Sequence, residues 1–363
     1  MPLDAGLAAW LRLTLVPGVG GQTLRKLLAE FGLPEQVLAA GRPAIARVVG
    51  DDLASRILSD AGAPSVERAL AWAELPGNAV VTLADDEYPR QLLEIPDPPA
   101  LLYVRGSRPL LSQRSLAVVG SRNATPQGLA NAENFARAFS QAGLTIVSGL
   151  ALGIDAAAHR GGLEGSGSTI GVLGTGVDVA YPARNAGLIA EVAERGAVIS
   201  EFPLGTPATA GNFPRRNRLI SGLARGVLVV EAAMSSGSLI TARLAAEQGR
   251  EVFAIPGSIH SPLAKGCHAL IKQGAKLVES AGDVLEELAS GTISASGAGA
   301  PPQPVRDPAH ARVLAHLGHD PCDLDTLAAR VGLTAGELSS ILLALELDGS
   351  VSCLPGGRYQ RLS

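Results

Sequence analysis

The sequence predicts an α/β protein whose main domain is an extended Rossmann-like parallel sheet covered by helices. Six short runs rich in β-branched residues lie between residues 116 and 257, and helix-type segments separate most of them. Each run is mostly apolar, and continuous apolar strands between helices are typical of a parallel sheet buried on both faces. The sequence pattern differs on either side of this region. Helical patterns fill residues 1–75, and a linker of small residues and prolines occupies residues 291–308.

The expected strands and the segments before them define the core domain. The strands are residues 116–120, 144–149, 169–174, 197–202, 226–232 and 251–257, with a candidate seventh at 276–280. The proline-rich segment 76–115 is expected to be a connector with one or two short strands, so the core domain is assigned to residues 76–290. Within residues 1–75, two apolar-periodic stretches around residues 17–21 predict a short-turn helical pair in a helical domain.

A small third domain is expected after the linker, over residues 309–363. Helix-type segments at 309–317, 323–331 and 335–348 precede a two-stranded hairpin around residues 355–357. Three helices followed by a hairpin are the outline of a winged helix-turn-helix, so this domain is predicted to be a winged helix.

The composition limits the classes of partner that fit. The 363 residues are 47% apolar and 18% charged, as in a globular chain with two or three domains. No apolar run approaches the roughly 18 residues of a membrane span, so no membrane partner is expected. The first residues lack a basic signal-peptide region, and the three cysteines lie far apart, which favours a reducing cytoplasm. The net charge of −4 requires that a nucleic-acid site be a local basic patch.

The turn after the first expected strand has the character of an anion site. Ligands of open parallel sheets lie beyond the carboxyl ends of the strands. Here Ser121 and Arg122 follow the strand, and Thr125 and Pro126 are suited to the N-cap and first position of a helix. Helix amide groups and the Arg122 guanidinium would together hold a phosphate. The alternative is a capped helix with a surface arginine.

The next two strand ends carry glycines and a few polar residues. Gly149 permits close approach of the backbone. Asp155 and His159 are four residues apart on the following helix, where a catalytic acid–base pair is weighed against capping or surface roles, which are favoured. The third strand leads into a glycine-rich turn that contains Arg184 and Asn185.

A positive stretch follows the fourth strand. No acidic residue lies between residues 202 and 230. Phe213 lies in this stretch, where an exposed aromatic ring is expected to stack on a base. The alternative for any one arginine is an ion pair with Glu201, Glu231 or a distant carboxylate. The stretch contains Arg215, Arg216, Arg218 and Arg225.

The fifth strand leads to a serine-rich turn, residues 235–238, which precedes a helix and is also suited to anions. It lacks the Gly-Lys-Ser/Thr of a Walker A loop. No strand end offers a nucleophile with its base or a convincing metal cluster, including the histidines near residues 316–322, so no catalytic residue, cofactor or metal is expected. A row of phosphate sites along one sheet edge suits a polymer, and a single strand in particular.

Seven motifs over about residues 80–285 resemble the DNA processing protein A family (DprA, also called Smf). They are GSRNATPQG, SGLALGIDAAAHRGGL, LGTGVDVAYPARN, SEFPLGTPATAGNFPRRNRLISGL, VVEAAMSSGSLITA, GREVFAIPGS and GCHALIKQGA. The resemblance implies a Rossmann-like core that binds single-stranded DNA without chemistry, forms a homodimer, coats incoming DNA in natural transformation and helps to load the RecA recombinase. It also implies an N-terminal SAM-like or helix-hairpin-helix domain, which the PGVG turn fits, and a C-terminal winged helix.

This resemblance implies DNA contacts at individual residues of this chain. Ala183 and Ala210 stand in loops where basic residues are expected, so Arg184 is assigned part of that role, and Arg216 joins the site as a member of the positive stretch. The dimer surface is expected within residues 245–290. The remaining expected DNA contacts are Ser121, Arg122, Gly149, Asn185, Phe213, Arg215, Asn217, Arg218 and Ser238.

Two alternatives belong to other classes. The core more distantly resembles the lysine-decarboxylase-like nucleoside-monophosphate phosphoribohydrolases, but the glutamate of their loop is missing after residues 235–238, and Glu247 comes too late. A duplex-binding regulator would use the helix at 334–349, which holds three acidic residues and no lysine or arginine. The winged helix is therefore expected to bind protein, or duplex DNA only very weakly.

Overall fold

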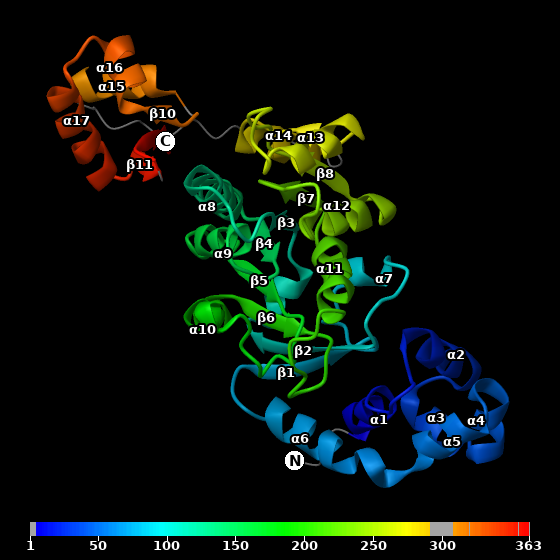
Figure 1. Cartoon of the computed structure of the whole chain (residues 1–363). Coiled ribbons are helices and arrows are strands. Elements are labelled where there is room, and N and C mark those ends of the chain that lie inside the picture. Colours follow the sequence, from blue (N-terminus) through cyan, green and yellow to red (C-terminus); the bar gives the residue numbers. More distant parts are fainter. Residues whose placement is uncertain (1–4, 291–307, 319, 355, 363) are drawn as a thin grey trace.

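The computed structural model describes residues 5–290, 308–318, 320–354 and 356–362. Figure 1 shows an N-terminal group of helices, a central sheet with helices on both faces and a small C-terminal unit. The predicted α/β core and the predicted outline of a winged helix are both present.

The N-terminal region is helical, as the sequence predicts, and it is built around buried apolar residues such as Trp10, Leu13 and Leu27. The α1–α2 pair is joined by the turn that contains Gly18 and Gly20. A SAM-like arrangement of these helices stays a prediction. The helices are α1 (Ala5–Thr14), α2 (Gly21–Phe31), α3 (Pro34–Ala39), α4 (Arg42–Val49), α5 (Asp51–Leu58) and α6 (Ala63–Ala73), with a short 3-10 turn η1 (Asp60–Gly62).

Nine strands form the central sheet in the order β1-β2-β6-β5-β4-β3-β7-β8-β9. All seven strands expected from 116 onward are present and run parallel. The connector strands β1 and β2 extend this sheet as an antiparallel pair, which the sequence pattern did not indicate. The strands are β1 (Asn78–Thr82), β2 (Leu101–Gly106), β3 (Ser115–Val119), β4 (Thr145–Ser148), β5 (Thr169–Val172), β6 (Ala197–Ser200), β7 (Gly226–Val229), β8 (Glu251–Ala254) and β9 (Lys276–Leu277).

Helices cover both faces of this sheet (Figure 1), which explains why its central strands β3 and β7 are buried at every residue. One face packs against α7 (Arg90–Leu93), α11 (Asn212–Leu223), α12 (Ser238–Glu247) and α13 (Lys265–Lys272). The other packs against α8 (Pro126–Gln141), α9 (Ile154–Leu163), α10 (Ala186–Arg195) and α14 (Ala281–Ser290). Two 3-10 turns, η2 (Arg108–Ser112) and η3 (Ala183–Asn185), complete the region.

The strand order reverses between β3 and β7. From β3 the chain proceeds through β4, β5 and β6 on one side, and then returns to place β7 on the other side of β3. Open parallel sheets bind ligands at such a reversal, because the connections diverge there and leave a crevice beyond the carboxyl ends of the strands.

The C-terminal unit has the predicted three helices and hairpin, with a core that includes Leu314, Leu338 and Leu342. A third short strand joins the hairpin, in the order β10-β12-β11. The elements are α15 (Pro308–Leu317), β10 (Cys322–Asp323), α16 (Leu324–Val331), α17 (Ala335–Leu347), β11 (Val351–Leu354) and β12 (Arg358–Arg361).

Within the described ranges, no single helix is long and apolar enough to cross a membrane. Only α16 and α17 taken together, bent by 104° at their junction, reach the required length and composition.

Candidate nucleic-acid interface

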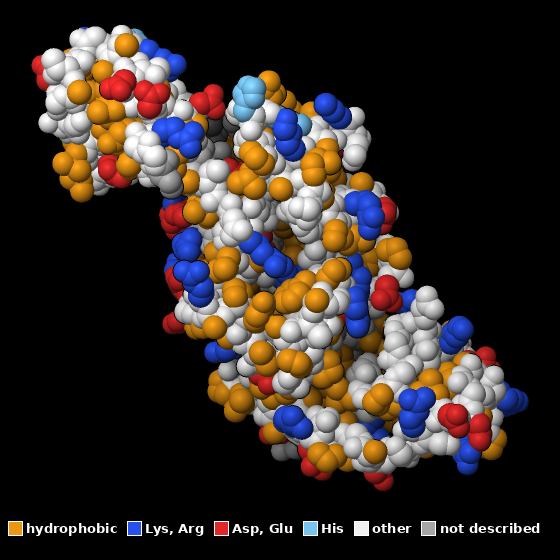
Figure 2. Space-filling model, viewed as in Figure 1, with side chains coloured by type: hydrophobic (Ala, Val, Ile, Leu, Met, Phe, Trp, Pro, Cys, Tyr) orange, Lys and Arg blue, Asp and Glu red, His pale blue; other side chains and the backbone are white. Residues whose placement is uncertain are grey.

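A cleft of about 750 Å³ lies at the reversal of strand order. The loops after β3 and β7 and one face of α11 line it. Figure 2 shows a hollow in the middle of the molecule with Lys or Arg side chains at its border. The cleft brings together six of the predicted contacts, namely Ser121, Arg122, Phe213, Arg216, Asn217 and Ser238.

The β3 loop presents Arg122 to solvent. The Ser121 N–H donates to the Glu231 carbonyl at 2.8 Å, which ties this loop to the end of β7. The Ser121 hydroxyl accepts the Asn123 N–H at 3.1 Å and so shapes the turn. Arg122 is exposed, and its guanidinium carbon lies 5.8 Å from the centroid of the Phe213 ring. This distance suits a cation–π contact that leaves the guanidinium accessible to an anion.

An aromatic pair lies next to Arg122 in the lining of the cleft. The rings of Tyr181 and Phe213 have their centroids 5.5 Å apart and are tilted by 38°. Tyr181 is 43% exposed. Aromatic faces next to a cation are the combination with which proteins stack bases and hold the adjoining phosphates. Tyr181 is not among the predicted DNA contacts, although an aromatic residue in a strand-end turn is a signal that indicates such a contact.

The positive stretch on α11 is divided between two faces of the helix. Because an α-helix turns about 100° per residue, Phe213, Arg216 and Asn217 face the cleft. Arg215 and Arg218 instead line a second cavity on another face of α11. The expectation of one continuous arginine patch is therefore wrong.

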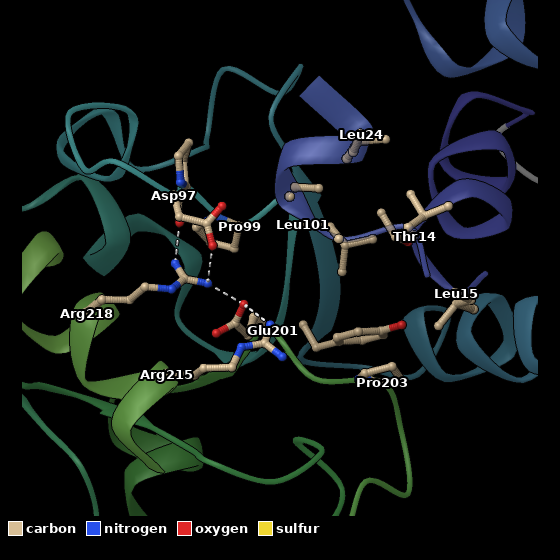
Figure 3. A pocket seen from close by; sticks show the side chains of 16 residues that line it. Thr14, Leu15, Leu24, Asp97, Pro99, Leu101, Glu201, Pro203, Arg215 and Arg218 are labelled. Atoms are coloured by element: carbon tan, nitrogen blue, oxygen red, sulfur yellow. Dashed lines mark hydrogen bonds and ion pairs between the residues drawn. The ribbon is translucent and has the colours of Figure 1, made fainter. Parts of the chain in front are cut away.

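Arg215 and Arg218 are paired with carboxylates on that other face (Figure 3). Arg218 Nη2 lies 2.5 Å from Glu201 Oε2, and its Nη1 donates to the Asp97 carbonyl. Arg215 Nη2 lies 3.4 Å from the same Glu201 oxygen. For these two predicted DNA contacts the structure shows the ion-pair alternative, and neither lines the cleft.

Arg216 forms the floor of the cleft. It is only 4% exposed, and its Nη1 donates to the carbonyls of Gly149, at 2.7 Å, and Val172. Burial lowers the pKa of its guanidinium to about 10, and the nearby Asp155 carboxylate opposes this shift. The expectation that Arg216 is an exposed phosphate contact is corrected, because its donors hold the carboxyl ends of β4 and β5 together.

Gly149 and Asn185 also direct their polar groups inward. The Gly149 N–H donates to Asp155 Oδ2 at 3.1 Å, and a Cβ at position 149 would lie 2.7 Å from Arg216 Nη1. Asn185 Nδ2 donates to the carbonyls of Leu150, at 2.9 Å, and Ala151, at 3.0 Å. Leu150 has a positive φ of 55°, so Asn185 holds a strained loop. These two predicted DNA contacts are internal supports of the cleft.

The amino end of α8 is already occupied by a carboxylate. The Thr125 N–H donates to Glu231 Oε2 at 2.9 Å, and the Thr125 hydroxyl donates to Glu231 Oε1 at 2.6 Å. Burial raises the pKa of Glu231, and these two hydrogen bonds oppose the rise. Thr125 is the N-cap, as predicted, and accepts the Gly128 N–H. The expectation that these helix amides hold a phosphate is wrong, because Glu231 takes that place.

The amino end of α12 has no side-chain cap and lines the cleft. Ser236 and Ser238 lie at this end, with their hydroxyl oxygens 2.7 Å apart. Asn217 Nδ2 approaches the Gly237 carbonyl at 3.5 Å. The Ser238 N–H donates to Ser236 Oγ at 3.4 Å and the Leu239 N–H to the Ser236 carbonyl at 3.2 Å, so α12 offers its serine hydroxyls to the cleft.

His159 is a neutral core residue. Its Nε2 accepts the Leu150 N–H at 3.2 Å, and its Nδ1 lies 2.8 Å from Thr169 Oγ1, which itself donates to the Ile146 carbonyl. Nδ1 therefore carries the proton. Burial lowers the pKa of His159 to about 3. The acid–base pairing of Asp155 with His159, weighed and disfavoured from the sequence, is not what the two side chains do.

Arg184 is exposed on η3 but is not among the residues that line the cleft.

In the part of the chain that the structure describes, no group of three or more His, Cys, Asp or Glu side chains is placed to hold a metal ion.

Comparison with known proteins agrees with the fold. The sequence profile of the family described as DNA recombination-mediator protein A matches residues 79–289. The chain belongs to this family. A second profile, the DprA winged helix domain, matches residues 297–357.

Individual relatives are similar over most of their length. Protein Smf of Escherichia coli is 45% identical over 304 residues, which are 82% of this chain and 81% of that protein. The crystal structure of DNA processing protein A from Streptococcus pneumoniae superposes with a TM-score of 0.67 at 40% identity, over 77% of this chain and 95% of its own. DNA processing protein A from Helicobacter pylori, described for its single-stranded DNA binding mode, gives 0.54 at 30% identity, over 58% of this chain and 96% of its own.

Proposed function

We propose that this chain binds single-stranded DNA in the cleft between β3 and β7 and performs no chemistry on it. The observation that carries the proposal is the convergence on one surface of Arg122, the Tyr181–Phe213 pair and the uncapped amino end of α12. A guanidinium and a helix amino end bind phosphates, and aromatic rings bind bases. The Helicobacter pylori relative, described as binding single-stranded DNA, supports the same ligand.

A single strand fits these groups better than a duplex. The bases of a duplex are stacked on one another, so their faces cannot reach Tyr181 or Phe213. A single strand splays its bases onto aromatic rings while its backbone follows a groove. These contacts read no base edge, so binding in the cleft is expected to show little sequence preference and a strong dependence on salt.

Membership of the family supports a proposal for the cellular role. We infer that the chain processes incoming DNA in natural transformation, coating the strand in the cytoplasm and helping to load the RecA recombinase. A homodimer is expected through residues 245–290, where α12, α13 and β9 border a groove of about 1120 Å³ with apolar residues in its lining. The winged helix is expected to bind protein, since α17 carries Glu337 and Glu346 and no basic residue.

A phosphoribohydrolase reaction is not favoured by the described residues. The loop after β7 offers serines in place of the glutamate of those enzymes, and Glu247 lies at the last position of α12. His159 is fully buried and Asp155 lines the cleft with little exposure, and both are engaged in internal hydrogen bonds.

Fluorescence anisotropy tests the proposal directly. Labelled oligo-dT and a matched duplex are titrated with the full chain across a salt series, without nucleotide or metal. We expect tight binding of the single strand that weakens steeply with salt, and weaker binding of the duplex. Equal affinity for both, or binding that does not respond to salt, would contradict the proposal.

A further inference from the structure

A second cavity, of about 110 Å³, lies where the N-terminal helices meet the sheet (Figure 3). A buried water needs about 10–15 Å³ of such space, so this cavity accommodates a larger ligand. Glu201 follows β6 as Ser121 follows β3, so the cavity opens on the same edge of the sheet as the cleft. Helix α11 separates the two and contributes Arg215 and Arg218 to the cavity.

The walls of the cavity combine apolar side chains with the charged groups of Asp97, Glu201, Arg215 and Arg218. They are formed by the end of α1, the start of α2 and the segment before β2, which place leucine and proline side chains around the space. Leu24 and Leu101 are buried, and Pro99 and Pro203 add the flat faces of their rings. Apolar faces together with convergent polar groups are typical of a site for a small organic ligand.

Two buried polar side chains in the lining have no hydrogen-bond partner for one of their oxygens among the described residues. They are Glu201, through Oε1, and Tyr103, through its hydroxyl. The Glu201 side chain is only 7% exposed, and Tyr103 is 1% exposed. Buried polar atoms are rarely left unpaired, because this destabilises the fold. The terminal torsion of a glutamate is soft, so either Glu201 oxygen can turn toward a donor in the cavity.

Arg215 supplies hydrogen-bond donors beside this acceptor. Its side chain is 62% exposed, and it reaches Glu201 only at the long distance of 3.4 Å. A ligand that satisfies both residues must offer N–H groups to the carboxylate and acceptors to the guanidinium. The proline and leucine side chains in the wall favour a ligand with a flat ring.

We propose that this cavity binds a guanine base. Guanine presents the N1–H and N2–H donors that pair with a carboxylate, and on its other edge the O6 and N7 acceptors that an arginine fork recognises. Thymine offers one N–H donor, and adenine has no ring N–H donor on this edge. The base comes either from the strand held in the cleft, in which case the inference rests on the proposed function, or from a free guanine nucleotide.

Two arms of one experiment distinguish these sources. In the first, anisotropy compares oligo-dT with the same oligonucleotide carrying one internal dG, using the full chain. We expect the dG to increase affinity about tenfold, within the range of one good bidentate base contact. In the second, calorimetry compares free dGMP with dTMP. Preference for dG in the oligonucleotide assigns the base to the strand, and preference for dGMP alone assigns it to a free nucleotide.

Variants then locate the site. Glu201→Gln is expected to abolish the guanine preference while oligo-dT binds equally or more tightly, since two arginines lose their counter-charge. Glu247→Gln removes an exposed carboxylate of α12 as a control and is expected to keep the preference. If circular dichroism shows that Glu201→Gln is unfolded, the exposed Arg215→Ala serves in its place, with the same expected loss.

The inference is overturned if wild-type protein binds dG and dT oligonucleotides equally and prefers neither mononucleotide, or if the preference survives in Glu201→Gln. Failure to bind oligo-dT at all would instead contradict the proposed function. The dGMP arm remains informative in that case.

Discussion

The amino ends of α8 and α12 border the same cleft, and they differ in what occupies them. At α8 the Glu231 carboxylate accepts the Thr125 N–H and hydroxyl and fills the place that a phosphate would take. At α12 no side chain caps the helix, and Ser236 and Ser238 lie beside its first turn. A helix amino end is an anion site only when no carboxylate of the same chain reaches it first.

The two faces of α11 repeat this contrast. Phe213 and Asn217 face the cleft, whereas Arg215 and Arg218 face Glu201 and Asp97. The positive residues that stand out most in the sequence are therefore the ones most neutralised by partners. The isolated Arg122 is the exposed arginine in the lining of the cleft, and it contacts the Phe213 ring.

The largest expected effect separates the two helix ends by stability. A Cβ at position 128 would lie 2.4 Å from the Glu231 carboxyl carbon, whereas a Cβ at position 237 has nothing within 4 Å. We expect Gly128→Ala to lower the free energy of unfolding by about 3 kcal/mol, and Gly237→Ala to change it by less than about 0.5 kcal/mol. Urea unfolding of both variants measures the difference. Equal stabilities would show that Glu231 does not fill the end of α8.

His159 on α9, which accepts a hydrogen bond from the loop after β4, makes the stability depend on pH. Since burial lowers the pKa of His159 to about 3 from the ordinary 6.5, the unfolded chain binds more protons between these values, and stability is lost as pH falls through this window. At 1.36 kcal/mol per unit, the loss from this residue between pH 6.5 and 4.5 is about 2–3 kcal/mol. Urea unfolding across this range should show a shallower slope in His159→Gln. An unchanged slope would assign the acid sensitivity to other groups.

Phe213 tests the base-stacking part of the cleft. Phe213→Ala removes a ring that contacts both Tyr181 and Arg122, and stacking is worth about 1–3 kcal/mol per base. We expect oligo-dT affinity to fall about tenfold, with the salt slope unchanged because no charge is lost. Anisotropy across a salt series checks both. A fall in slope with little loss of affinity would show that the ring only positions Arg122.

Much of the fold could be predicted because it is encoded locally. Apolar runs, the helix spacing around them and the terminal hairpin each depend on neighbouring residues, and the strands after 115 and the three C-terminal helices are confirmed. The antiparallel strands β1 and β2 were foreseen only as part of a connector. Nothing within Asn78–Thr82 indicates that it pairs with β2, or that β2 then pairs with β6.

The site was less predictable, because the wrong predictions concern contacts between residues that are distant in sequence. Glu231 reaches Thr125 across 106 residues, and Arg216 reaches Gly149 across 67. No local pattern reveals either contact. The division of α11 is different, since applying the helical period to residues 213–218 would have separated Phe213, Arg216 and Asn217 from Arg215 and Arg218.

The most direct test of the account compares Arg122→Ala with Arg215→Ala, using Arg108→Ala as a surface control, in the salt dependence of oligo-dT binding. If the strand lies in the cleft, Arg122→Ala weakens binding by about 1–3 kcal/mol and lowers the slope of log K against log salt by about 0.7. Arg215→Ala and Arg108→Ala leave both quantities unchanged. The opposite pattern, a loss in Arg215→Ala with Arg122→Ala unaffected, would place the strand on the other face of α11 and contradict the account.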